Sequence, residues 1–241
     1  VIVTGYAPKT LDNPDLHWEQ TSQLNVGFDM RFLNNFNAVV DIYKKKTTGI
    51  LREVPIPGYV GVSSRPVANV ADMENKGVEL ELGYNNTFRD VVFSVNGNVA
   101  YLQNKVTYLN SDADFIAGDA SFQSMGPVTR IQVGQSYNSF YGFKTDGIFQ
   151  NWAEINAYKT DAGNLIQPKA QPGDFKWVDT DKDGIITDND KTFLGSNIPK
   201  WTYGLTLNAA YKGFDLMVFA QGAAGSKIFQ GLRRLDIANS N

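Results

Sequence analysis

The chain has 241 residues, no cysteine, a single histidine and a formal net charge of −3. The lack of cysteine excludes a disulfide scaffold and a thiolate metal site, and the lone His17 excludes most histidine-based metal and triad chemistry. The charge indicates no basic surface for nucleic acid. No apolar run reaches the roughly 18 residues of a membrane helix, so any membrane role of these residues would be carried by strands.

A strict alternation of apolar and polar residues runs from Gln23 to Tyr43 and is interrupted only at Asn34–Asn35. A period of two indicates a β-strand with one apolar and one polar face. Two such runs joined by an Asn-rich turn predict an antiparallel hairpin. Each run has about nine to eleven residues, which is the length that a tilted transmembrane strand needs.

Two further hairpins repeat this pattern. They occupy residues 77–99 and 203–220, with predicted turns at Asn85–Asp90 and Lys212–Gly213. Long connections, including Thr47–Lys76 and Leu102–Gln135, leave the other ends of the hairpins. Outer-membrane barrels have this asymmetry, with short periplasmic turns and long extracellular loops.

The two faces of the hairpins predict two environments. The polar faces carry charges in mid-strand, and aromatic residues gather near the strand ends, where the rings of membrane barrels occupy the two interfaces. The side chains expected to face the lumen are Asp29, Arg31, Asp41, Glu79 and Glu81. The side chains expected to face lipid include Leu24, Phe28, Val40, Leu80, Leu205 and Leu216.

These patterns predict an all-β fold, an antiparallel transmembrane β-barrel segment with long extracellular loops. The alternative is a soluble calcium-binding β-sandwich for adhesion or carbohydrate binding, with one solvated sheet face. Three minor elements are also predicted: a strand at Ser136–Thr145, a short helix at Asn151–Tyr158 and a strand at Phe175–Val178. The basic run Lys44–Lys46 is interpreted as a solvated strand end.

The sequence assigns no catalytic residue. Glu79 and Glu81 are paired carboxylates on one strand face, a pattern that acid–base catalysis can use. Neighbouring carboxylates on a strand are more often a solvated wall, and no nucleophile–base constellation accompanies them. The chain is therefore predicted not to be an enzyme, and no substrate-binding residue is assigned.

Residues 179–190, with the sequence DTDKDGIITDND, fit a twelve-residue calcium loop of the EF-hand type. Carboxylates at positions 1, 3 and 5 converge on a hard cation, and a glycine at position 6 allows the sharp turn. Position 12 is Asp rather than the usual Glu, and the shorter side chain predicts a modest affinity. The predicted ligands are Asp179, Asp181, Asp183, Ile185 through its carbonyl, Thr187 and Asp190.

Several segments together resemble the SusC/RagA family of TonB-linked outer-membrane transporters. They follow one another in family order and include the calcium-type loop. The others are residues 13–19 (NPDLHWE), 41–48 (DIYKKKTT), 75–80 (NKGVEL), 126–130 (GPVTR), 140–149 (FYGFKTDGIF) and 198–204 (IPKWTYG). His17 departs from the family, which commonly has Lys there. Val1–Tyr6 resembles a Val-rich segment that precedes the family's plug, although it stands directly before barrel sequence.

The resemblance implies that residues 1–241 are part of a 22-stranded barrel in the cell outer membrane, without the plug domain and the last strands. It places the loop 179–190 in an extracellular connection. It also implies active import of a glycan or a peptide, driven by TonB, which would act through the N-terminal region that this chain lacks. The implied partners are a SusD-like surface lipoprotein and outer-membrane lipid, and Ca²⁺ is the cofactor predicted from the residues of the loop itself.

Overall fold

The computed structural model describes residues 9, 11–54, 58–62, 64–111, 113–118, 121–122 and 126–231. The segment Val1–Tyr6, singled out in the sequence, lies outside these residues. The chain divides into two compact units. We call residues 1–116, 132–137 and 198–226 the sheet unit, and residues 117–131, 138–197 and 227–241 the loop unit.

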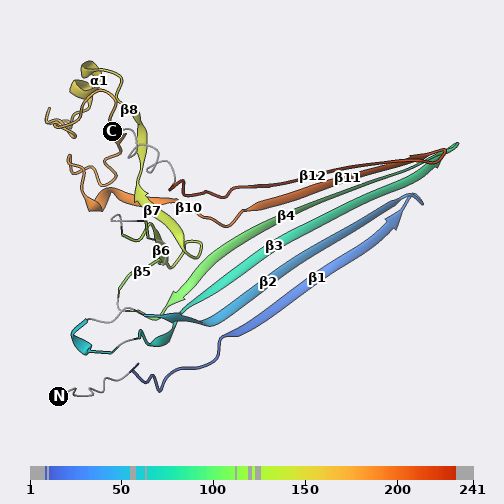
Figure 1. Cartoon of the computed structure of the whole chain (residues 1–241), viewed down its shortest axis with the longest axis horizontal. Coiled ribbons are helices and arrows are strands. Elements are labelled where there is room, and N and C mark those ends of the chain that lie inside the picture. Colours follow the sequence, from blue (N-terminus) through green and yellow to red (C-terminus); the bar gives the residue numbers. More distant parts are fainter. Residues whose placement is uncertain are drawn as a thin grey trace, which may run out of the picture. The chain divides into compact units, whose positions relative to one another are not determined.

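The sheet unit is built on six antiparallel strands in the order β1-β2-β3-β4-β11-β12 (Figure 1). The first four strands form a meander, and β11 pairs with β4 from a distant part of the sequence. The register of all three predicted hairpins preserves the alternation seen in the sequence. The strands are β1 (Gln20–Phe32), β2 (Phe36–Glu53), β3 (Val67–Phe88), β4 (Val91–Leu109), β11 (Trp201–Tyr211) and β12 (Phe214–Ala224).

Tight turns close one end of each hairpin. Lys212 and Gly213 have φ angles of 45° and 85° between β11 and β12, so both occupy the left-handed region that short hairpin turns require. The turn predicted at Asn85–Asp90 is shorter in the structure, because β3 continues to Phe88 and β4 begins at Val91.

The strands extend further from these turns than the alternation predicted. The predicted connection Thr47–Lys76 contains the last part of β2 and the first part of β3. A break in the β2–β3 register between Thr47 and Ile50 removes the period of two from the sequence there. Gly49 sits in this bulge with a φ of 66°, and its N–H donates to Asp72 Oδ1 at 2.9 Å. Beyond the bulge, Ile50, Val70 and Ala71 form a small buried core.

The predicted connection Leu102–Gln135 is also partly strand. It includes the end of β4, β5 (Phe115–Ala117) and β6 (Thr129–Gln132). The run Lys44–Lys46, interpreted as a strand end, lies in the middle of β2. In both places the polar composition predicted a loop or a strand end, whereas main-chain pairing continues the strand.

The loop unit contains short elements and its own core. Phe149, Ile155 and Ala170 are buried together, with Tyr158 packed against them. The predicted helix and the predicted strand at Phe175–Val178 are confirmed as α1 and β9. The further elements of this unit are β7 (Ser139–Phe143), β8 (Thr145–Ile148), α1 (Trp152–Ala157), β9 (Phe175–Trp177), η3 (Asp188–Asp190) and β10 (Lys191–Gly195), whereas η1 (Gly58–Val60) belongs to the sheet unit.

The smaller sheets have the orders β10-β7-β6-β5 and β8-β9. Asn151 caps α1 by accepting a hydrogen bond from the Glu154 N–H at 2.9 Å. None of the helices in the described residues is both long enough and apolar enough to cross a membrane.

Candidate membrane wall and metal loop

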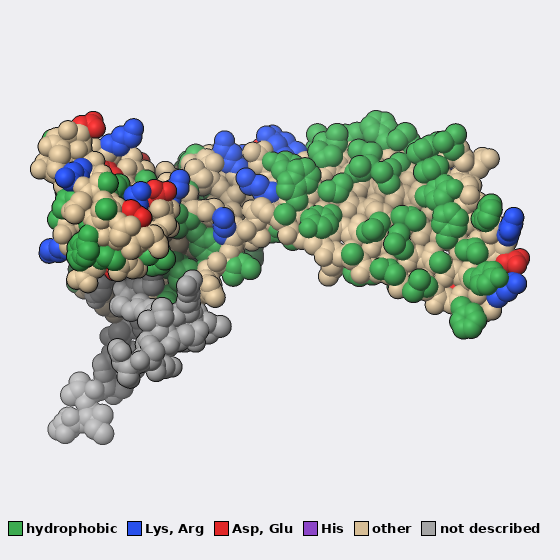
Figure 2. Space-filling model, turned by 90° about the horizontal axis from the view of Figure 1, so that it is seen from above, with side chains coloured by type: hydrophobic (Ala, Val, Ile, Leu, Met, Phe, Trp, Pro, Cys, Tyr) green, Lys and Arg blue, Asp and Glu red, His purple; other side chains and the backbone are tan. Residues whose placement is uncertain are grey.

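One face of the six-stranded sheet is apolar and exposed. The register aligns Val26, Ile42 and Val78 across β1, β2 and β3, and the same face continues across β4, β11 and β12. Figure 2 shows hydrophobic side chains spread over a face of the molecule. Leu24 is 69% exposed, Phe28 64% and Leu216 62%. A continuous apolar surface of this kind requires a partner or a lipid environment.

Aromatic rings lie at both ends of this apolar face. Near the tight turns, Phe36 stands between Phe32 and Tyr84, with ring centroids 5.3 and 4.5 Å away. Toward the other end, the rings of Tyr101 and Trp201 are 4.7 Å apart on β4 and β11. Aromatic side chains at two levels of an outward face are typical of the two interfaces of a membrane barrel.

The opposite face of the sheet is polar. The register places Asp41 on β2 beside Glu79 on β3, and Asn25 Nδ2 donates to Asp41 Oδ1 at 3.4 Å. Glu81 and Arg31 lie on the same face, with Val39 and Asn37 as their partners on β2. The structure thus brings the charged side chains predicted for the lumen onto one surface.

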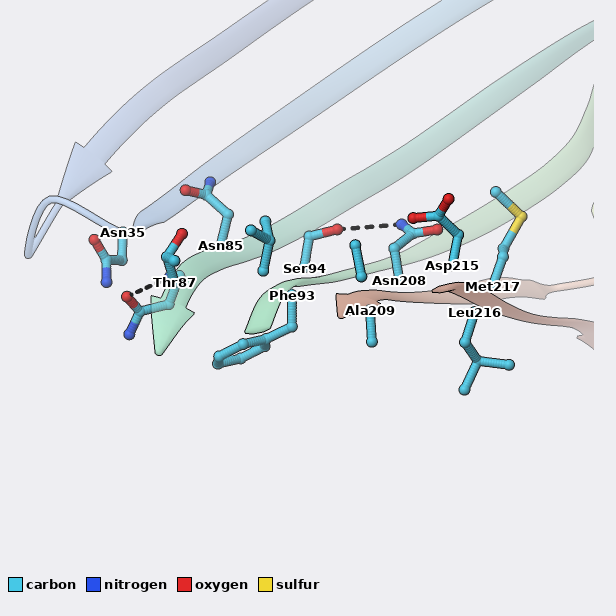
Figure 3. A pocket seen from close by; sticks show the side chains of 13 residues that line it. Asn35, Asn85, Thr87, Phe93, Ser94, Asn208, Ala209, Asp215, Leu216 and Met217 are labelled. Carbon is cyan, nitrogen blue, oxygen red and sulfur yellow. Dashed lines mark hydrogen bonds between the residues drawn. The ribbon is translucent and has the colours of Figure 1, made fainter. Parts of the chain in front are cut away.

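Figure 3 shows the two faces at the end of the sheet that carries the tight turns. Phe93, Ala209 and Leu216 point to one side of the strands, whereas Ser94 and Asn208 point to the other. Asn208 Nδ2 donates to Ser94 Oγ at 3.1 Å across β4 and β11. The residues belong to the lining of a recess of about 620 Å³ that both faces contribute to. Adjacent strand positions therefore meet different surroundings.

The loop unit positions the calcium-type loop between β9 and β10. Tyr158, packed on the core of the loop unit, donates its hydroxyl to the Trp177 carbonyl at 2.7 Å. The same hydroxyl accepts a hydrogen bond from the Asp179 N–H at 3.3 Å. The first residue of the loop is thereby fixed to the core by a side chain that sequence reasoning did not identify.

The first three acidic positions of the loop converge. Carboxylate oxygens of Asp179, Asp181 and Asp183 lie within 4.8 Å of one another. Gly184 has a φ of 89° and donates its N–H to Asp179 Oδ2 at 2.9 Å. Asp179 Oδ1 is buried and accepts no hydrogen bond within the described residues. A buried acceptor without a donor fits a hard cation, which prefers oxygen ligands.

The last position of the loop is held by the backbone. Asp190 is fully buried, and its two oxygens accept the N–H groups of Thr180 at 2.6 Å and Thr187 at 2.7 Å. Thr187 caps η3, and together with Asp190 it forms a capping box. Ile185 has an exposed side chain. Metal ligation by these three residues stays a prediction.

The loop carboxylates differ in their affinity for protons. A hydrogen bond from the Asp183 N–H favours the charged form of Asp181, but desolvation and the neighbouring carboxylates outweigh it and raise the pKa of Asp181. Desolvation acts against ionised Asp190, but hydrogen bonds led by those from Thr187 and Thr180 hold its pKa below the usual value. The charge of Asp190 is stabilised by the fold, whereas the charge of Asp181 is not.

Sequence reasoning missed a charged cluster on the apolar side of the sheet. Glu74 accepts ion pairs from Lys44 at 2.8 Å and Lys76 at 2.6 Å. The signal was present in the sequence, because Lys44 and Lys46 continue the even-numbered series of outward residues in β2. The charge of these lysines is typical of a solvated strand end, although their position in the alternation is that of outward-facing strand residues.

The comparison with known proteins decides between a barrel and a sandwich. The family described as "TonB dependent receptor-like, beta-barrel" matches residues 3–233. The chain belongs to this family. The proteins of this family are outer-membrane proteins, so the predicted fold class and location are confirmed and the soluble β-sandwich is not supported.

Individual relatives agree with this membership. The chain is 31% identical to TonB-dependent receptor P3 of Formosa agariphila over 233 residues, which are 95% of the chain and 22% of that protein. It is 25% identical to TonB-dependent receptor SusC of Bacteroides thetaiotaomicron, over 90% of the chain and 20% of that protein. The chain thus spans about a fifth of the length of these relatives.

A solved structure of the same family shows the same strand arrangement. The structure of the RagAB peptide transporter matches with a TM-score of 0.67 and 26% identity, over 89% of this chain and 22% of that chain. These matches confirm the resemblance to SusC/RagA transporters. The matched proteins are receptors and transporters, in agreement with the prediction that the chain is not an enzyme.

Proposed function

We propose that the protein containing this chain actively imports a nutrient, a glycan or a peptide, across the outer membrane. The observation that carries the proposal is the match of residues 3–233 to the TonB-dependent receptor barrel. Its likeness to SusC and to the RagAB peptide transporter supports a nutrient as the cargo. The apolar face of the sheet contacts lipid, and the polar face lines the passage.

The lumen-facing side chains form a hydrated polar surface along the path of the cargo. Asp41 and Glu79 lie side by side on neighbouring strands, and Glu81 and Arg31 extend the same surface. Exposed carboxylate and amide groups hydrogen-bond water and polar solutes, so a hydrophilic cargo passes them without crossing an apolar surface. Energy would come through TonB, and a SusD-like surface lipoprotein would capture the cargo at the extracellular end.

Growth of a deletion strain tests the proposal. The strain would lack the gene of the full-length protein and would be supplied with either a polysaccharide or a peptide mixture as the limiting nutrient. We expect slower growth on one of the two, restored by the full-length gene. Co-purification of the tagged protein from outer membranes should recover a lipoprotein of the SusD type. Unchanged growth on both nutrients would contradict import.

We also propose that the loop 179–190 binds one Ca²⁺ ion as a structural staple. The convergence of Asp179, Asp181 and Asp183 and the unpaired buried Oδ1 of Asp179 support it. Bound calcium would neutralise the repulsion among these carboxylates. Ile185, Thr187 and Asp190 would complete the ligand set, with Asp190 also serving as the N3 residue of the capping box that Thr187 begins.

Calcium binding can be measured on the full-length protein in detergent. After chelation and buffer exchange, isothermal titration should show one calcium ion that the variant Asp179→Asn/Asp183→Asn does not bind. Asp161→Asn is a matched control, because Asp161 is an exposed carboxylate of the same unit. Equal binding by the double variant and the control would contradict the site, and magnesium should bind more weakly than calcium.

A further inference from the structure

A group of four lysines lies on the apolar side of the sheet, just beyond the hydrophobic band. We call Lys44, Lys46, Lys76 and Lys105 the lysine cluster. The register places Lys44 on β2 opposite Lys76 on β3. Glu74 on β3 lies between Lys46 on β2 and Lys105 on β4. Lys44 also pairs with Leu24, which belongs to the apolar series of β1. The lysines therefore continue the lipid-facing rows of their strands.

An apolar groove begins at the lysine cluster and follows the strands toward the membrane band. Its volume is about 440 Å³, and Lys44 and Lys76 contribute to its lining. The apolar part of its wall comes from Leu24, Val26, Ile42, Val78 and Tyr101 on four successive strands. A groove of this composition, with ammonium groups beside it, matches the two parts of a lipid molecule.

A second, smaller recess lies between the lysines themselves. Its volume is about 280 Å³, and its lining includes Lys76, Lys105, Gln103 and Thr107 together with the Glu74 carboxylate, which is paired with Lys44 and Lys76. Ammonium, amide and hydroxyl groups are the donors that phosphate oxygens accept hydrogen bonds from. The recess therefore offers a polar site next to the apolar groove.

The cluster carries more positive than negative charge. Glu74 is paired with Lys44 and Lys76, and Lys46 lies 4.0 Å from Asp72. Lys105 is exposed and forms no ion pair with any residue that the structure describes. Four ammonium groups thus face two carboxylates. Hydrogen bonds from Lys44 and Lys76 lower the pKa of Glu74 to about 2, so this count holds at neutral pH.

The position of the cluster identifies the leaflet. The tight turns Lys212–Gly213 and Arg89–Asp90 close the opposite end of the strands. In outer-membrane barrels the short turns are periplasmic, so the lysine cluster lies at the level of the outer leaflet. The cluster occupies β2, β3 and β4, which are flanked by other strands of this chain on both sides. Lys and Arg side chains gather along the border of the apolar surface in Figure 2.

We propose that the lysine cluster and the apolar groove bind a phosphate-bearing lipid of the outer leaflet. Phosphate groups of the lipid contact Lys76, Lys105 and Lys44, and an acyl chain lies along the groove. Clusters of basic side chains at the membrane surface attract anionic lipids, and each lysine strengthens binding about fivefold. This proposal depends on the membrane orientation of the sheet and not on the imported nutrient.

Native mass spectrometry of the full-length protein in a neutral detergent tests the proposal. The probes are diphosphorylated lipid A, its dephosphorylated form and inorganic phosphate, each titrated onto protein stripped of lipid. We expect retention of diphosphorylated lipid A and much weaker retention of the dephosphorylated lipid. Inorganic phosphate should neither bind nor compete at the same concentration, because it lacks the acyl chains. Equal binding of both lipids, or equally tight binding of inorganic phosphate, would overturn the proposal.

Charge-matched variants connect the binding to these side chains. Lys44→Gln/Lys76→Gln/Lys105→Gln should weaken lipid A binding about a hundredfold, at about fivefold per lysine. The control Lys144→Gln/Lys159→Gln/Lys169→Gln removes three exposed lysines of the loop unit and should leave binding unchanged. If both triple variants lost lipid A binding equally, the net charge of the protein would explain the loss, and the assigned site would be wrong.

Two single variants keep the test informative if the triple variant does not fold. Lys105→Gln breaks no ion pair among the described residues and should weaken binding about fivefold. Glu74→Gln removes the carboxylate that competes for Lys44 and Lys76, so it should tighten binding. A cluster that serves only as a structural ion-pair network predicts the opposite sign for Glu74→Gln, and weaker binding in that variant would contradict the proposal.

Discussion

The sheet unit and the loop unit place their apolar side chains in opposite ways. In the sheet unit large apolar residues point outward, and Leu24 and Phe28 are more than half exposed. In the loop unit Phe149 and Ile155 are 1% and 3% exposed and form an interior. The first unit is built for a lipid solvent and the second for water, although a single chain passes back and forth between them.

The two units also satisfy their polar groups differently. The strands of the sheet unit pair along long registers, so main-chain partners satisfy most of their backbone, and side chains take over at the bulge, where Asp72 accepts the Gly49 N–H. The loop unit depends on single side chains that replace absent main-chain partners, and Asp190 and Tyr158 are its clearest examples. Substitutions at such positions should therefore lower the stability of the loop unit locally. Substitutions in the sheet should change the free energy of folding the barrel into the membrane.

Removal of the Asp190 carboxylate should have the largest effect. Asp190→Ala leaves the N–H groups of Thr180 and Thr187 without their acceptor, and hydrogen bonds to a charged group contribute about 1.5–3 kcal/mol each. We expect the local opening free energy of the loop unit to fall by about 3 kcal/mol or more. Hydrogen exchange of the full-length protein would measure this loss in residues 179–195.

Asp188→Ala is the matched control for this variant. Asp188 belongs to the same helix η3, but its side chain is 86% exposed and pairs with Lys191 at 2.9 Å. An exposed pair of this kind contributes little, so exchange should change by less than about 1 kcal/mol. If the two variants lost equal protection, the buried carboxylate would not organise the loop.

A charge on the outward face of the sheet should have the next largest effect. Leu80→Arg places a guanidinium charge on the lipid side of β3, midway between Lys76 and the Tyr84 ring, and should cost about 2–4 kcal/mol of barrel folding free energy. Glu81→Arg, one position away on the polar face, should cost far less. Equilibrium unfolding of the refolded full-length barrel in lipid vesicles would give both values. Equal costs for the two variants would contradict the assigned faces.

The ion pairs of Glu74 should produce a smaller effect that depends on pH. Hydrogen bonds from Lys44 and Lys76 lower its pKa from 4.5 to about 2 in the folded protein. The charged form is favoured by folding, so the stabilisation is fully present above pH 4.5 and is lost as the pH falls toward 2. The difference in unfolding free energy between wild type and Glu74→Gln should follow this course. A difference that does not change over this pH range would contradict the ion pairs.

The sequence was sufficient for the parts of the fold that repeat a simple period. The alternation in Gln23–Tyr43 predicted the faces of β1 and β2, because a strand with two solvents on its two sides must alternate. It failed beyond Gly49, because the bulge there shifts the register and the polar composition resembles a loop. The lysine cluster was missed for a related reason, since charged residues outside the apolar band still occupy lipid-facing rows.

The candidate metal loop was predictable in part. The spacing of Asp179, Asp181 and Asp183 determined their convergence, because the loop turns sharply at Gly184. The buried position of Asp190 could not be read from spacing, since one of its oxygens accepts the N–H of Thr180 ten positions earlier. Long-range contacts to single backbone groups leave no periodic trace in a sequence.

Spin labels on adjacent residues of β11 test the central claim most directly, that one face of the sheet meets lipid and the other meets water. Residues 1–241 contain no cysteine, so once any cysteine elsewhere in the full-length protein is replaced, Leu205→Cys and Thr206→Cys can each carry a single nitroxide in lipid vesicles. The label at position 205 should collide with oxygen dissolved in the lipid, and the label at 206 with a water-soluble nickel chelate. Equal accessibility of the two labels to both reagents would contradict the account.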